Sequence, residues 1–150
     1  MYLTWESVAK QLTALKTPIE QLIALTLADI ERYPKMNENG EHLAQLLANL
    51  NYYVMQLGEC QPKYKRLDIW CEKRYEIEKG LETVRIHRDE NKAVNYAQNA
   101  KYEKIQNFLD TMVEASAMHM RVQNARSSAR DTTEAIRSRI GQLRGAQRSN

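Results

Sequence analysis

Residues 63–92 read KYKRLDIWCEKRYEIEKGLETVRIHRDENK, and they decide the fold that we expect for this chain. At about 100° per residue, the large apolar side chains of this stretch fall on one side of a helix that begins just after Pro62. Farther along, the same side becomes cationic. The apolar positions are Leu67, Trp70, Cys71, Ile77, Leu81 and Val84. We therefore expect a long central helix whose buried face ends in a basic surface.

Two interpretations of this basic end stay open. Unpaired buried cations are costly, so the cations must lie at a surface or line a cavity, where they find carboxylates, water or a ligand. In the first interpretation the helix pairs its own charges, as solvated helices commonly do. The pairs would be Arg74 with Glu78, and Arg85 and Arg88 with Glu82 and Asp89. In the second, the cations contact a negatively charged polymer.

Composition places the chain in the all-α class. Its 150 residues amount to one helical domain over 1–150, with 5 Gly and 3 Pro and no alternating apolar and polar run of the kind that predicts strands. The net charge of +3 is unevenly spread: residues 1–60 have net −3, residues 61–110 net +2 and residues 111–150 net +4. This distribution predicts an acidic helical front over 1–60, a basic central helix over 61–92 and a long C-terminal helical region over 97–145. It also favours either a polyanion on the back half or head-to-tail contacts between subunits.

Proline, glycine and serine mark the expected helix boundaries. Thr17-Pro18 reads as a cap and the start of a new helix after a segment over 4–16, and Pro34 ends that second helix. PKMNENG, residues 34–40, is the clearest loop, and a third helix should begin at Asn39 or Gly40. Gly58 caps it, and Gln61-Pro62 makes a turn into the central helix, so that neighbouring helices pair antiparallel.

The C-terminal region should hold an oligomerisation helix. A break near Ser127 and Ser128 is expected from a capping box, and the closing residues GAQRSN read as a frayed tail. The apolar seam of the last helix is too narrow to hold it in place alone, so we expect it to pack on another helix, including one from a second copy. The predicted subunit interface comprises Ile136, Ile140, Leu143, Arg137 and Arg144. Without the break, a single ridge would align Arg126, Arg130, Arg137, Arg144 and Arg148, facing either DNA or the acidic front of a neighbour.

Catalysis finds little support in the sequence. No nucleophile elbow, phosphate-binding loop or zinc helix is present, and the three histidines are scattered. His119 is better explained as a hydrogen-bonded core imidazole than as a catalyst. We expect Cys60 and Cys71 to be reduced cysteines of a cytoplasmic protein, and we expect no enzyme activity, no metal, no cofactor and no membrane span.

Single-stranded DNA is the partner that the central region favours most. Cations that follow phosphates and aromatic faces that stack on bases together hold single strands. The predicted phosphate contacts are Lys73, Arg74, Lys79, Arg85, Arg88 and Lys92, and Tyr75 or Tyr96 offers a stacking face. The irregular segment around 89–97 could be a loop or a helix that orders on binding.

The layout also resembles a known family. The helix containing LDIWCEKRYEIEKGLETVR, the irregular middle, a second long helix and the terminal RSSARDTTEAIRSRIGQLRG are similar to phage recombination mediators of the UvsY type. The family's basic stretch is loosely matched by Glu78-Lys79-Gly80-Leu81, without the arginine expected after the lysine. The resemblance implies a small helical homo-oligomer that binds single-stranded DNA, with a recombinase or a single-strand-binding protein as further partner. The alternative is a phage-type helical adaptor or inhibitor that works through protein contacts alone.

Overall fold

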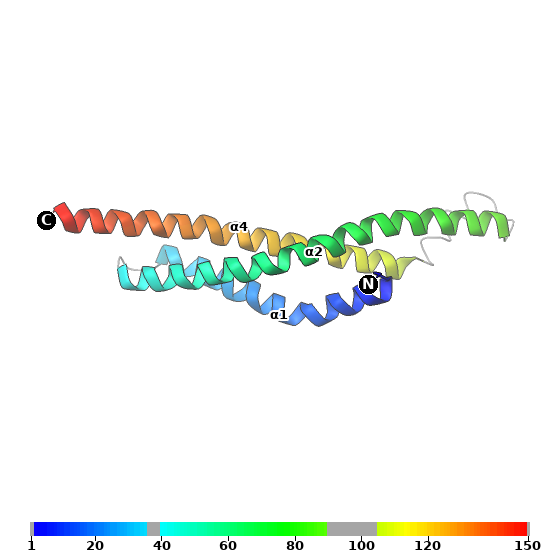
Figure 1. Cartoon of the computed structure of the whole chain (residues 1–150), viewed down its shortest axis with the longest axis horizontal. Helices are drawn as coiled ribbons and strands as arrows, with labels where there is room; N and C mark the ends of the chain where they lie inside the picture. The colour runs from blue at the N-terminus through cyan, green and yellow to red at the C-terminus, as the bar shows by residue number, and fades with distance from the viewer. Residues whose placement is uncertain (1, 36–39, 90–104, 150) are drawn as a thin grey trace. The chain divides into compact units, whose positions relative to one another are not determined.

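Long helices make up almost all of the computed structural model, which describes residues 2–35, 40–89 and 105–149. The elements are α1 (Trp5–Arg32), the short 3-10 turn η1 (Tyr33–Lys35), α2 (Gly40–Asp89) and α4 (Gln106–Ser149) (Figure 1). Within the described ranges only residues 2–4 and 105 are outside a helix, and no strand occurs. The all-α prediction is therefore confirmed, with three long helices that pack together.

The ends of α1 and the start of α2 follow local sequence signals. Thr4 and Ser7 form a reciprocal cap at the start of α1, in which each backbone N–H donates to the other residue's hydroxyl oxygen at 2.9 and 3.1 Å. At the other end, α1 stops at Arg32, just ahead of Pro34. The start of α2 at Gly40 agrees with the predicted third helix.

The two predicted proline breaks are wrong, because both α1 and α2 continue through their prolines, Pro18 and Pro62. An interior proline removes one helical hydrogen bond and costs about 3 kcal/mol. Leu57 and Tyr64 are almost completely buried on either side of Pro62, and each large apolar side chain gains roughly 1.5–3 kcal/mol from burial. Packing on both sides thus outweighs the proline, so Gly58 caps no helix and the chain makes no turn at Pro62.

The predicted break near Ser127 and Ser128 and the frayed tail are also wrong, because α4 is continuous to Ser149. Ala125 and Ala129 are buried on one face of this stretch. Small side chains let a neighbouring helix approach closely, and they carry no strong apolar signal in the sequence. The buried face therefore runs through the region where the sequence pattern fades.

Two compact units divide the described chain. Unit 1 contains Met1–Ala14 and Lys63–His119, and unit 2 contains Leu15–Pro62 and Met120–Asn150. Each unit includes a segment of all three helices and has its own core. One domain over 1–150 stays a prediction.

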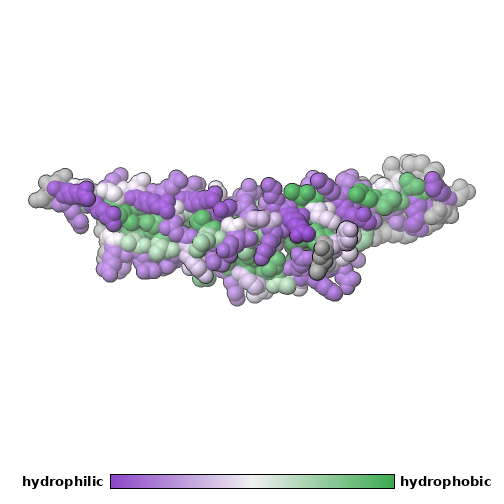
Figure 2. All heavy atoms as spheres, in the orientation of Figure 1, coloured by the Kyte–Doolittle hydropathy of each residue, from purple (hydrophilic) through white to green (hydrophobic). Residues whose placement is uncertain are grey.

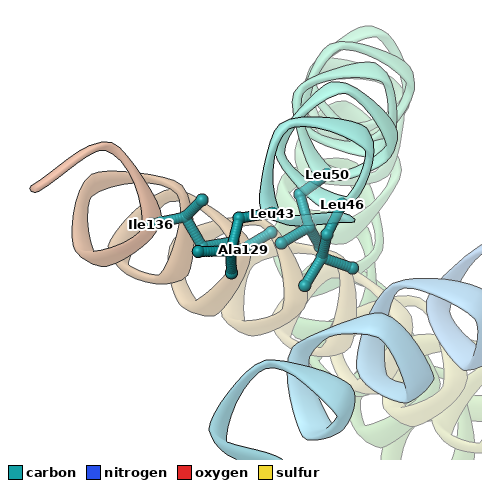
Figure 3. Close-up of a cluster of buried hydrophobic side chains, with 5 residues drawn as sticks. All are labelled: Leu43, Leu46, Leu50, Ala129 and Ile136. Atoms are coloured by element: carbon teal, nitrogen blue, oxygen red, sulfur yellow. The ribbon is translucent and has the colours of Figure 1, made fainter. Parts of the chain in front are cut away.

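One buried cluster in the core of unit 2 is formed between α2 and α4 (Figure 3). Ile136 of α4 is completely buried in this cluster, and Ile140 and Leu143 pack against it. Of the apolar seam predicted for subunit contacts, Ile136 is thus buried within the chain, whereas Ile140 and Leu143 are only partly buried. The five buried members are Leu43, Leu46, Leu50, Ala129 and Ile136.

The core of unit 1 uses only part of the predicted face of α2, since Leu67 and Cys71 are buried as expected. Tyr64, Leu67, Cys71 and Tyr75 are its buried positions on this helix. The expected continuation of that face is exposed: Ile77, Leu81 and Val84 have 50, 58 and 52% of their surface open to solvent. We call these three residues the exposed apolar stripe. Figure 2 shows hydrophobic side chains on the surface of the C-terminal half of α2.

Candidate nucleic-acid interface

The cations of α2 are largely neutralised by carboxylates of the same helix. Arg74 donates from Nε to Oε1 of Glu78 at 2.9 Å, and its Nη2 lies 2.9 Å from the same oxygen. Arg85 binds Glu82, with Nη2 2.7 Å from Oε1. These contacts agree with the first interpretation of the basic end, in which the helix pairs its own charges.

Lys79 is also paired, and it shields an aromatic ring. Its Nζ lies 2.8 Å from Oε1 of Glu76 and 5.2 Å from the centroid of the Tyr75 ring. Tyr75 itself is only 5% exposed and belongs to the core of unit 1. Its ring is therefore not an open stacking face, and a base could reach it only if the core rearranged.

The remaining residues predicted to contact DNA in this region are Lys73, Arg88, Lys92 and Tyr96. Lys73 and Arg88 are exposed on α2, and neither has an ion pair with a carboxylate in the described ranges. Lys92 and Tyr96 lie outside the described residues. Of the five predicted phosphate contacts that the structure describes on α2, two therefore have no carboxylate partner among the described residues and three are held in pairs.

A second set of cations lies on α4. Because this helix has no break, Arg126, Arg130, Arg137, Arg144 and Arg148 fall within about 40° of one another around its axis and about 100° from Ile136. We call these five residues the arginine ridge. It spans about 33 Å of helix at the usual rise per residue.

The arginine ridge keeps its charge because its partners are neutral. Arg137 donates to Oδ1 of Asn51 at 3.2 Å, and Arg126 donates to Oε1 of Gln61 at 2.9 Å. Amide oxygens accept hydrogen bonds without cancelling a positive charge. None of the five arginines has an ion pair with a carboxylate of the described chain. The unbroken α4 therefore aligns the five arginines along one side of the helix, as the sequence predicts only if the break is absent.

Arg126 is anchored more firmly than the rest of the ridge. Its guanidinium lies against Gly58, where an added Cβ would be 2.9 Å from Nη2. Pro62 has no N–H to donate to the carbonyl oxygen of Gly58, four residues earlier. The glycine and the proline that were predicted to end a helix instead lie beside the site where this guanidinium packs on α2.

One constellation outside these surfaces contains residue types that could perform catalysis. Asp68 Oδ2 lies 2.9 Å from Nδ1 of His119, and Asp68 is three residues before Cys71. Burial, and to a lesser degree Asp68, raises the pKa of the Cys71 thiol to about 11. A buried, protonated thiol is neither a nucleophile nor a metal ligand. His119 is thus the hydrogen-bonded imidazole that the sequence predicted, and the described residues contain no group of three His, Cys, Asp or Glu that could hold a metal.

The aromatic residues of unit 1 form a cluster that the sequence analysis did not identify. Trp5 stacks on Phe108 with ring centroids 4.7 Å apart and meets Trp70 edge-on at 5.0 Å. A pocket of about 280 Å³ opens beside them, lined by Leu3, Thr4, Trp5, Trp70 and Arg74. No periodicity links a residue at position 5 to residues 70 and 108, so only the tertiary structure could bring them together.

No protein-family model, no curated protein and no solved structure matches this chain. None of the helices in the described ranges combines the length and apolarity that a membrane crossing requires.

Proposed function

We propose that this chain binds single-stranded DNA as a non-enzymatic accessory protein of phage recombination or replication, and that it acts as a homo-oligomer. One observation carries the proposal: the arginine ridge of α4 faces solvent or neutral amides rather than carboxylates. Lys73 and Arg88 of α2 serve as additional phosphate contacts.

The physical argument is the release of counterions. Each guanidinium that neutralises a phosphate frees a condensed cation, and binding to single strands weakens with log salt by about 0.7 per contact. The ridge has four exposed arginines beyond the anchored Arg126: Arg130, Arg137, Arg144 and Arg148. The paired cations of α2 contribute less, because a phosphate must first displace their carboxylates.

The resemblance to UvsY-type mediators supports the choice of single strands and of a recombinase or single-strand-binding protein as further partner. Antiparallel pairing of two long helices belongs to the same proposal. The order of the contacts supports it, since Asn51 bonds Arg137 and Gln61 bonds Arg126. Oligomerisation through α4 would have to use surfaces other than Ile136, which the chain itself buries.

A second candidate function is a helical adaptor or inhibitor that acts through protein contacts alone. The exposed apolar stripe of α2 favours it, because three large apolar side chains at i, i+4 and i+7 form one face that could dock on a partner helix. Such a face gives an association that depends little on salt.

Salt dependence separates the two candidates. We expect the affinity for a fluorescent oligothymidylate, measured by anisotropy, to fall about 50-fold between about 50 and 200 mM salt if the four exposed ridge arginines contact phosphates. Light scattering with and without the oligonucleotide gives the mass of the oligomer in each state. An oligonucleotide that is not retained at about 50 mM salt would refute the proposed function and favour the adaptor.

A further inference from the structure

The pocket beside the two tryptophans has the size of a site for one small ring system. Its volume is about 280 Å³, which is the space of roughly nine water molecules and lies just below the range of sites for drug-sized ligands. The described residues that line it all belong to unit 1. The pocket therefore has room for one heterocycle.

The aromatic walls are held in position before any ligand arrives. Trp5 is fixed on one side by the stacked ring of Phe108, with the planes only 6° apart, and it meets Trp70 at 69°. The indole N–H of Trp5 is buried and has no hydrogen-bond partner within the described chain. A rigid aromatic wall loses little conformational entropy when a flat ring stacks on it.

Arg74 defines the chemistry that the pocket accepts. Its Nε donates to Oε1 of Glu78 and its Nη2 lies 2.9 Å from the same oxygen, whereas Nη1 has no bond to a described residue. Because Glu78 neutralises its charge, Arg74 acts at the rim as a hydrogen-bond donor rather than as a net cation. Its Nη1 suits a flat ring with oxygen or nitrogen acceptors at its edge, which describes a nucleobase.

We propose that this pocket binds one base of a bound single strand, with the base stacked on the indole of Trp70 and Arg74 donating to an acceptor at the base edge. The inference rests on the proposed function, since the rest of the strand would be held by phosphate contacts. It replaces Tyr75, which is buried, as the stacking position.

The chain provides its own reporter for this pocket. It contains two tryptophans, and both line the pocket. We expect an oligothymidylate to quench the intrinsic fluorescence and an abasic strand of equal length and charge to leave it nearly unchanged. Because one stacked base contributes a factor of about 5 to 150 in affinity, the abasic strand should also bind more weakly by that factor.

Substitutions test whether the preference for the base-containing strand arises from the pocket. Trp70→Leu should remove the preference for the strand that carries bases, whereas Trp70→Phe should retain most of it, because a phenyl ring still stacks. Arg74→Gln should reduce binding of the base-containing strand and not of the abasic one. Tyr52→Leu is the matched control, since Tyr52 is an exposed aromatic of unit 2 and its loss should change neither affinity. Circular dichroism verifies that each variant stays helical.

The outcomes distinguish failure of the inference from failure of the proposed function. Equal affinity for both strands with unchanged fluorescence would overturn the base site and leave phosphate binding intact. A Trp70→Leu variant that keeps its preference for bases would also overturn it. If an apolar peptide quenches the tryptophans and the oligonucleotide does not, the pocket is a protein-docking site. If neither strand binds at low salt, the proposed function itself fails.

Discussion

The C-terminal halves of α2 and α4 both contain apolar side chains and cations, but the two helices differ in which of these are exposed and which are paired. In α2 the apolar stripe is exposed and three of the neighbouring cations, Arg74, Lys79 and Arg85, are paired with carboxylates. In α4 the apolar seam is buried or partly buried and the arginines keep their charge. The number of cations in a segment therefore says little about whether they are available to a ligand.

The difference arises from the partners that each helix has. In α2 a glutamate lies three or four residues from each paired cation, such as Glu78 from Arg74, so the pairs form within one helix. Between residues 120 and 149, seven arginines face only two acids. Arg137 is three residues from one of them, Glu134, yet it bonds Asn51 of α2 instead. Tertiary contacts have thus directed a guanidinium away from a carboxylate on its own helix.

The largest expected effect is a difference in the free energy of unfolding between a substitution in the buried seam of α4 and one in the exposed apolar stripe of α2. Ile136→Ala should lower the free energy of unfolding by about 2–5 kcal/mol, because it leaves a cavity in the core of unit 2. Leu81→Ala, at the exposed stripe, should change it by no more than about 0.5 kcal/mol. Urea unfolding measures both. Equal losses, or a change of oligomer mass with no loss of stability for Ile136→Ala, would mean that the seam belongs to a subunit interface.

The next effect compares the two sets of cations directly. Arg130→Gln/Arg144→Gln should weaken binding of single-stranded DNA roughly 25-fold at about 0.1 M salt and reduce the salt slope by about 1.4. Lys79→Gln/Arg85→Gln removes the same charge from α2, where carboxylates already neutralise it, and should cost only a few-fold. The prediction would be contradicted if the α2 variant lost as much affinity for single-stranded DNA as the ridge variant in the same anisotropy titration.

Two glycines of α2 test how Arg126 is anchored. Nothing lies within 4 Å of a Cβ added at Gly80, so Gly80→Ala should stabilise the protein by about 0.5–1 kcal/mol through helix propensity. Gly58→Ala should gain about 1 kcal/mol less, because the new methyl group displaces the guanidinium and its bond to Gln61. Thermal unfolding of the double variant Gly58→Ala/Arg126→Ala completes a double-mutant cycle for the contact between Gly58 and Arg126. If the two glycine variants behave alike, the close packing of Arg126 on α2 has no energetic consequence.

The smallest effect near neutral pH concerns the two cysteines, one in each unit. Because burial raises the pKa of Cys71 from 9.0 to about 11, the folded protein holds this proton more tightly than the unfolded chain does. The resulting stability is fully present below pH 9.0 and is lost as the pH rises toward 11. Cys71→Ala should lack this alkaline component when unfolding is followed across that range.

Thiol labelling gives an independent measure of the same difference. At about pH 8, iodoacetamide should modify the partly buried Cys60 first and Cys71 only as the chain unfolds, as mass spectrometry of the peptides would show. In urea both thiols should react at similar rates. Equally fast labelling of the two in the folded protein would contradict the burial of Cys71.

The sequence predicted the secondary-structure class much better than it predicted the boundaries of the helices. It identified the all-α class, the end of α1 before Pro34 and the start of α2 at Gly40, because these depend on local composition and turn chemistry. It failed at Pro18 and Pro62 because the local cost of a proline was weighed without the burial on either side. It failed near Ser127 because buried alanines look neutral in an apolar pattern.

For the candidate site, the amino-acid order by itself determined the charges, their helical phase and the pairs formed within α2. Arg74 with Glu78 and the alignment of the arginine ridge both follow from 3.6 residues per turn. Only the tertiary structure decided that the ridge is unbroken, that neutral amides of α2 lie beside it and that Trp5 meets Trp70 and Phe108. The reason is physical: contacts across long sequence separations depend on which helices pack together, and no local periodicity records that choice.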